Sequence, residues 1–180
     1  MSKVITFGGK AESGKTFSAK MLQEKLQKNN QRCLMINFAD ALKFIATSYF
    51  GWDGKKDDAG RRLLQNLGTD IVRKRNPNFW VNFVIEFIKV FSIDYDYFLI
   101  TDLRFRGEYF CFLENDIEAL SINVVRLDFE NGLTDEQRNH PSERDLDDFK
   151  FDYTLSSKSG LDNLSKEVDR LYDNFLGSYW

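Results

Sequence analysis

Short apolar segments alternate along this chain with longer segments in which apolar residues recur every three or four positions. The short segments have the length of buried strands and lie at residues 3–7, 32–38, 97–101, 121–127 and 153–156. The longer segments predict helices at residues 15–28, 39–49, about 57–75, 79–91 and 161–176. Strands that alternate with helices indicate βαβ units. We therefore predict an α/β fold in three layers, α/β/α, with a five-stranded parallel sheet.

The helix predicted after Pro77 is unusually rich in aromatic residues. Asn78 is a plausible N-cap for it, because Asn is favoured at that position. The aromatic and aliphatic side chains recur at helical spacing, so we interpret them as core residues rather than as an aromatic binding site. These residues are Phe79, Trp80, Phe83, Val84, Phe87 and Phe91.

Composition narrows the class of protein further. The 180 residues suit one domain, and 42% apolar residues exclude intrinsic disorder. A formal net charge of −3 argues against a nucleic-acid binder, which usually carries a basic excess. The most apolar stretch, residues 79–100, contains Glu86, Lys89, Asp94 and Asp96, so we predict no membrane span. We expect a soluble protein of the cytoplasm, in a bacterial or a phage-infected cell.

Residues 9–16 match the phosphate-loop pattern G-x-x-x-x-G-K-[ST] between the first strand and the first helix. Glycines let backbone N–H groups surround phosphate oxygens, and the helix N-terminus favours anions. Lys15 would reach the β- and γ-phosphates, while the Thr16 hydroxyl would ligate Mg²⁺. We expect a nucleoside triphosphate with Mg²⁺ here, although the loop does not distinguish ATP from GTP. The residues expected at the nucleotide are Gly9, Ala11, Glu12, Ser13, Gly14, Lys15, Thr16 and Phe17.

Polar residues after the second strand predict the other side of the cleft. Asp40 could hold the acceptor group or a Mg-bound water, or it could cap a helix; both roles stay open. Gly68 costs stability inside a helix, so it indicates a close approach to the backbone or a helix break. Four polar residues near Gly68 fall on one helical face: Arg62, Gln65, Thr69 and Arg73. This face could bind a phosphate and the edge of a base, or it could simply face solvent.

The third strand ends in Asp102, as in a Walker B strand, which predicts a carboxylate that acts on Mg²⁺ through water. Arg104 follows, either to bind phosphate or to brace the loop. Arg104 and Glu108 have the i, i+4 spacing of an ion pair.

The segment from about 128 to 150 is polar and charged, and we predict a mostly irregular lid there. Arg126 ends the strand before it. The lid contains Arg138, His140, Glu143 and Arg144, whose arginines could neutralise a transferring phosphoryl group; an ordinary solvated loop is the alternative.

Together these segments resemble the deoxynucleoside monophosphate kinases of bacteriophages, within the P-loop nucleoside monophosphate kinase superfamily. The specific part of the resemblance is the Arg-Arg-Leu-Leu-Gln stretch with Leu-Gly-Thr-Asp at residues 61–70. The remaining parts are residues 9–16, 38–43, 79–81, 100–105 with Glu108, and 140–143.

The resemblance implies phosphorylation of a deoxynucleoside 5′-monophosphate by Mg-ATP, with a helical acceptor region over about 40–95. It implies catalytic roles for Lys15, Asp102, Arg104 and Arg126, and an adenine-side loop at Ser157 and Lys158, where the family often has an Asn-Asp-Gly-like turn. The residues expected at the acceptor are Lys10, Asp40, Lys43, Arg62, Gln65, Thr69, Arg73, Trp80, Arg104, His140 and Glu143.

Other functions of the same motifs stay open. A different acceptor would make the protein another small-molecule kinase, such as a dephospho-coenzyme A kinase, and hydrolysis without an acceptor would make it a nucleotide-switch ATPase. We expect small nucleotides as partners, and neither nucleic acid nor membrane. Exposed aromatics such as Trp180 could serve a homodimer contact.

Overall fold

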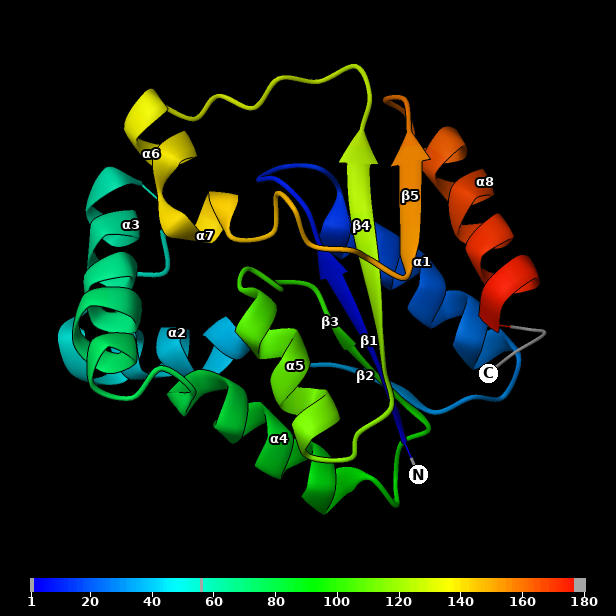
Figure 1. Cartoon of the computed structure of the whole chain (residues 1–180), viewed down its shortest axis with the longest axis horizontal. Coiled ribbons are helices and arrows are strands. Elements are labelled where there is room, and N and C mark those ends of the chain that lie inside the picture. The colour runs from blue at the N-terminus through cyan, green and yellow to red at the C-terminus, as the bar shows by residue number, and fades with distance from the viewer. Residues whose placement is uncertain (1, 56, 177–180) are drawn as a thin grey trace.

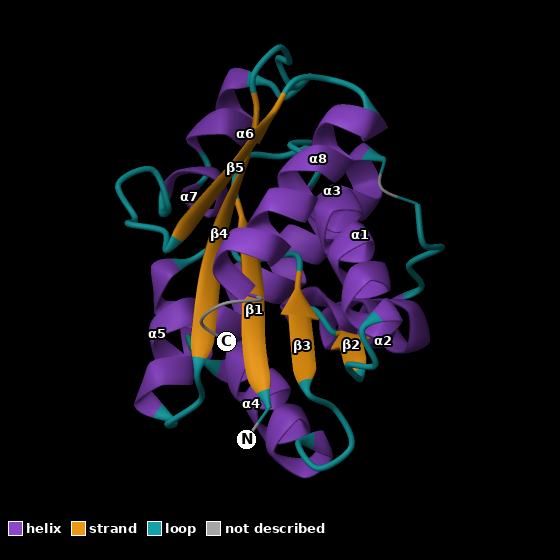
Figure 2. Ribbon diagram, turned by 90° about the vertical axis from the view of Figure 1, so that its right-hand side faces the viewer, coloured by secondary structure: helices purple, strands orange, loops and turns teal. Residues whose placement is uncertain are grey.

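The computed structural model describes residues 2–55 and 57–176, and its centre is a five-stranded sheet (Figure 1). Every neighbouring pair of strands is parallel, in the order β2-β3-β1-β4-β5, so the carboxyl ends meet at one edge (Figure 2). Trp180 lies outside the described residues. The strands are β1 (Lys3–Gly8), β2 (Cys33–Met35), β3 (Tyr97–Ile100), β4 (Ala119–Arg126) and β5 (Tyr153–Ser157).

Helices follow most strands, as the alternating pattern predicts. None of the helices in residues 2–55 and 57–176 is long and apolar enough to cross a membrane. The α-helices are α1 (Lys15–Lys28), α2 (Phe38–Phe50), α3 (Asp58–Gln65), α4 (Phe79–Phe91), α5 (Arg106–Glu114), α6 (Asp135–Asn139), α7 (Pro141–Arg144) and α8 (Leu161–Leu171). Two π-helices extend α3 and α8: η1 (Asn66–Arg73) and η2 (Tyr172–Leu176).

The two faces of the sheet carry separate cores, because successive side chains of a strand point to opposite faces. Ile5 and Leu99 pack on one face with Leu22 of α1 and Val168 of α8. Val4, Phe98 and Ile100 pack on the other face with α4 and α5. Figure 1 shows α1 and α8 on one side of the sheet and α4 and α5 on the other. This confirms the three-layer α/β/α architecture.

Several elements differ from the prediction. The second strand ends at Met35, and its apolar continuation enters α2, whose first turn closes a capping box between Asn37 and Asp40. Helix α5 was not predicted, although Glu108 at its N3 position is a helix-start signal. The predicted irregular lid contains the short helices α6 and α7. Asn78 makes no side-chain cap bond at the start of α4.

The interpretation of the whole aromatic stripe of α4 as core is wrong. Trp80 and Val84 are buried, but Phe79, Phe83 and Phe91 are 42%, 50% and 37% exposed. The sheet covers one side of α4, while the apolar residues extend around more of the helix than one side. The outer aromatics therefore face solvent in this chain.

Candidate active site

The phosphate loop joins β1 to α1 at the carboxyl edge of the sheet. Gly9 and Gly14 have φ angles of 120° and 103°, which glycine adopts most readily. A Cβ at Gly9 would lie 2.5 Å from the carbonyl oxygen of Val124, so only glycine fits beside β4. The Ser13 hydroxyl is buried in the loop without a hydrogen-bond partner among the described residues. A loop with an unsatisfied buried hydroxyl fits a phosphate oxygen.

Lys15 begins α1 and folds back onto the loop. Its ammonium donates hydrogen bonds to the carbonyl oxygens of Gly9, at 2.9 Å, and Lys10, at 2.6 Å. Burial, together with the positive charge of Arg104, lowers the pKa of Lys15 to about 7. An anion bound at the loop would have the opposite effect on this pKa, because it favours the charged form.

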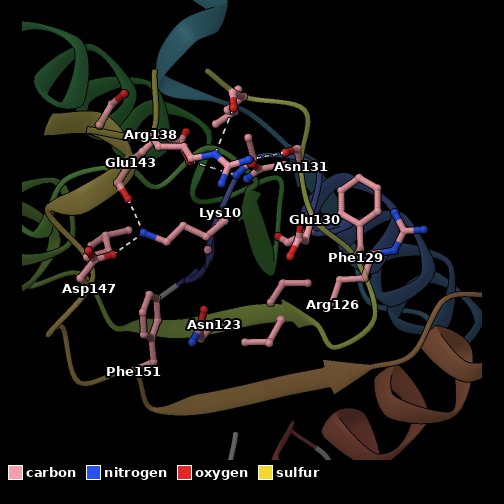
Figure 3. Close-up of a pocket in the computed structure, with 18 residues that line it drawn as sticks. Lys10, Asn123, Arg126, Phe129, Glu130, Asn131, Arg138, Glu143, Asp147 and Phe151 are labelled. Atoms are coloured by element: carbon pink, nitrogen blue, oxygen red, sulfur yellow. Dashed lines mark hydrogen bonds and ion pairs between the residues drawn. The ribbon is translucent and has the colours of Figure 1, made fainter. Parts of the chain in front are cut away.

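The lid contacts the phosphate loop directly through Glu143 of α7. One carboxylate oxygen of Glu143 accepts a hydrogen bond from the Ala11 backbone N–H at 3.1 Å, and the other is paired with the guanidinium of Arg104. Lys10 donates to the Glu143 carbonyl oxygen at 2.5 Å and forms an ion pair with Asp147 (Figure 3). A carboxylate therefore occupies a position where loop and arginine would hold a phosphate oxygen.

A cavity of about 560 Å³ lies between the phosphate loop, the end of β4 and the lid (Figure 3). Arg126 lines it, with its guanidinium 4.0 Å from the centre of the Phe129 ring and bonded to Ser159 Oγ. Sequence reasoning missed several lining residues, because they are scattered over strand and lid without a shared pattern. The missed residues include Asn123, Phe129, Asn131, Asp147 and Phe151.

Asp102 follows β3 and is bonded to the start of α2. Its carboxylate accepts the backbone N–H groups of Phe38 at 3.1 Å and Ala39 at 2.9 Å. Burial raises the pKa of Asp102. Asp40 is at the N3 position of α2 rather than at the N-cap, which is Asn37. Its carboxylate accepts the Asn37 N–H at 2.9 Å and pairs with Lys43 at 3.1 Å.

The donor set suits Mg²⁺, which prefers hard oxygen ligands, keeps several waters and usually takes one or two protein groups besides phosphates. Asp102 and Thr16 offer such oxygens. Within residues 2–55 and 57–176, no group of three or more His, Cys, Asp or Glu residues could hold a metal alone.

A second cavity, also about 560 Å³, lies between η1, the start of α4 and the start of α5. Thr69 and Arg73 line it, whereas Arg62 and Gln65 do not. The helix changes from α to π at Asn66, between these two pairs of residues, and the angle between successive side chains changes with it.

Two predicted contacts are wrong. Trp80 is 2% exposed and its indole N–H donates to the Gly68 carbonyl oxygen at 3.1 Å, so it is a core residue rather than a substrate ligand. Gly68 does allow a close approach: a Cβ there would lie 2.7 Å from Leu42 Cδ2. The side chain of Arg104 forms an ion pair with Glu143 and not with Glu108. The Glu108 carboxylate accepts a hydrogen bond from the backbone N–H of Arg104 instead.

The remaining predicted residues lie around this edge of the sheet. His140 caps α7 by accepting the Ser142 N–H at its Nδ1 atom. Ser157 is buried at the end of β5, and Lys158 is exposed next to it. Glu12, Thr16 and Phe17 belong to the loop and the first turn of α1, where Phe17 is 57% exposed.

The parallel sheet between two helical layers, with a phosphate loop after β1, defines the fold of the P-loop kinases. Residues 20–168 match the model of the deoxynucleotide monophosphate kinase family. The chain belongs to this family and is an enzyme, a nucleotide kinase. The matched range begins after the phosphate loop, so the loop is a separate indication of nucleotide binding.

Solved structures with low sequence identity resemble this chain over nearly its whole length. Shikimate kinase from Bacteroides thetaiotaomicron has a TM-score of 0.50 and 13% identity, over 97% of this chain and 98% of that one. The Mycobacterium tuberculosis APS kinase CysC in complex with AMPPNP and APS has a TM-score of 0.47 and 14% identity, over 96% and 98%. The likeness to shikimate kinase shows the fold alone. No curated protein matches the sequence.

Proposed function

We propose that this protein transfers the γ-phosphoryl group of ATP, bound with Mg²⁺, to a deoxynucleoside 5′-monophosphate. The observation that carries the proposal is the cluster of anion-binding groups at the carboxyl edge of the sheet. Arg104 is connected to the phosphate loop through Glu143, and its backbone N–H is bonded to Glu108, which lines a second cavity. Family membership supports a nucleotide as the acceptor.

The donor side of the proposed reaction belongs to the phosphate loop. Its N–H groups, the Ser13 hydroxyl and Lys15 would bind the phosphates of ATP. Arg126, which lines the first cavity, and the neighbouring Ser157 and Lys158 would lie toward the adenine side. Thr16 and Asp102 would hold Mg²⁺, which supplies positive charge to the β- and γ-phosphate oxygens when bound.

The acceptor side includes Lys10 and Arg62 as ligands of the monophosphate, and Thr69 and Arg73 at the second cavity. An acceptor phosphate oxygen attacks the γ-phosphorus in line, the bond to the β,γ-bridging oxygen breaks, and ADP leaves. The acceptor is already ionised near neutral pH, so no general base is needed. Lys15 and Arg104 would stabilise the charge that spreads over the equatorial oxygens. The lid would exclude water and so limit hydrolysis.

The test is ADP release from Mg-ATP with each of the four common deoxynucleoside monophosphates, with the matching ribonucleotides, and with shikimate and dephospho-coenzyme A. Stimulation by one or more deoxynucleoside monophosphates, with the diphosphate detected as product, supports the proposal. Stimulation only by a non-nucleotide acceptor overturns it in favour of another small-molecule kinase. Release that is indifferent to every acceptor would indicate an ATPase.

A further inference from the structure

Glu108 is a buried carboxylate that the proposed reaction does not use. Only 3% of it is exposed, although it lies in the first turn of α5. One oxygen accepts the backbone N–H groups of Arg104 at 2.8 Å and Phe105 at 3.0 Å, and the other is paired with the guanidinium of Arg73. A buried charge is strongly unfavourable unless it is paired and hydrogen-bonded, and both conditions hold here.

The first contact fixes the direction in which Arg104 extends. The two N–H groups belong to consecutive residues of the loop between β3 and α5, so their shared acceptor restricts that loop. The side chain of Arg104 leaves this loop toward the phosphate loop, where it pairs with Glu143. Any shift of the backbone at Arg104 would move its guanidinium relative to the γ-phosphate.

The second contact fixes Arg73 of η1. Its guanidinium lies 4.5 Å from the centre of the Phe105 ring, so Arg73 is stacked on the same loop that Glu108 holds. Arg73, Phe105 and Glu108 all line the second cavity, together with Thr69. The acceptor-side helix and the loop of Arg104 therefore meet at one carboxylate.

We propose that Glu108 is a positioning residue that sets the distance between the acceptor cavity at Arg73 and the phosphate-directed Arg104. The proposal rests on the proposed function, because it assumes an acceptor nucleotide between these two arginines. Glu108 lines the acceptor cavity, but both of its oxygens are bonded to protein groups, so we assign it no role as a substrate ligand. Its effect is on alignment, and a misplacement of reacting groups by about 1 Å can cost about a hundredfold in rate.

The experiment compares Glu108→Gln with the wild-type protein in steady-state transfer to the deoxynucleoside monophosphate that the wild type phosphorylates best. Gln keeps an oxygen for the two N–H groups and has nearly the same volume, but it loses the charge that holds Arg73. We expect kcat/KM for the monophosphate to fall about tenfold or more, while KM for ATP changes less than about twofold.

Asp152 offers a matched control. Its carboxylate accepts the Ser121 N–H at 2.8 Å and the Tyr109 hydroxyl at 3.0 Å, directly before β5, and Asp152 lines neither of the two cavities. Asp152→Asn also removes a hydrogen-bonded carboxylate charge, but from an exposed residue that lines neither cavity, so it controls for the loss of such a charge outside the site. We expect its ratio of kcat/KM values for the two substrates to equal that of the wild type.

A double variant, Glu108→Gln with Arg73→Gln, tests whether the two residues act as a unit. If the two residues act as a unit, kcat/KM for the monophosphate in the double variant should be no lower than in the less active single variant. If they act independently, the two fold-losses in kcat/KM should multiply. Equal losses toward both substrates, or an unchanged monophosphate kcat/KM in Glu108→Gln, would overturn the proposal while leaving the function intact. A wild-type protein that phosphorylates no nucleotide would instead overturn the proposed function, and this proposal with it.

Discussion

The low pKa of Lys15 predicts that ATP binding takes up a proton. In the protein without nucleotide, burial and Arg104 lower this pKa to about 7. Phosphate oxygens at the loop would favour the ammonium form and raise the pKa well above 9. Between these two values the complex holds one more proton than the separate partners, so rising pH must weaken binding.

The magnitude follows from the two pKa values. With a pKa of about 7 before binding, Lys15 is about nine-tenths neutral at pH 8, so about 0.9 proton is taken up per nucleotide. The apparent affinity should then fall about fifty-fold between pH 7 and pH 9, provided that the pKa in the complex exceeds 9.

Isothermal titration calorimetry with Mg²⁺ and a non-hydrolysable ATP analogue measures both quantities. Titrations at pH 8 in two buffers of different ionisation enthalpy give the number of protons, and a series from pH 7 to pH 9 gives the affinity. Lys15→Met, which has no titrating group, should bind weakly with little pH dependence and should lose transfer activity. A flat wild-type affinity from pH 7 to pH 9, or the same slope in Lys15→Met, would refute the reasoning.

Three further variants test individual contacts. Trp80→Phe leaves the Gly68 carbonyl oxygen without its donor and should lower the free energy of unfolding by about 1–3 kcal/mol in urea titrations, with KM values unchanged; a large KM effect would restore Trp80 as a ligand. Gly68→Ala brings a Cβ against Leu42 and should cost about 1–3 kcal/mol, part of which Leu42→Ala should recover in the double variant. Arg62→Ala should raise KM for the monophosphate about tenfold and leave KM for ATP unchanged, whereas equal effects would make Arg62 structural.

Local patterns predicted most of the fold. The range 15–28 coincides with α1, because its apolar spacing follows Gly14 directly and ends before Asn29. The length of the second strand could not be predicted, because Ile36 and Phe38 are as apolar as the strand residues but lie after its end. Helix α5 was missed, because its apolar residues give a weak periodicity and its start depends on a buried Glu108.

The candidate site was predictable where one segment carries the chemistry, as in the phosphate loop. It was not predictable where partners come from distant segments. Arg104 and Glu143 are 39 positions apart, and Arg73 and Glu108 are 35 apart, so neither pair has a local signal. The i, i+4 spacing predicted an ion pair between Arg104 and Glu108, but this spacing brings side chains together only within a helix. Helix α5 begins at Arg106, so Arg104 lies before it.

The contact of Glu143 with the phosphate loop makes nucleotide binding an exchange reaction. Before any phosphate arrives, the Ala11 N–H, Arg104 and Lys10 already have negative or carbonyl partners in the lid. The phosphates of incoming donor and acceptor nucleotides replace one set of negative groups by another, so fewer small ions are released than for an open basic cleft. Binding to this site should therefore depend less on ionic strength than the number of its cationic groups suggests.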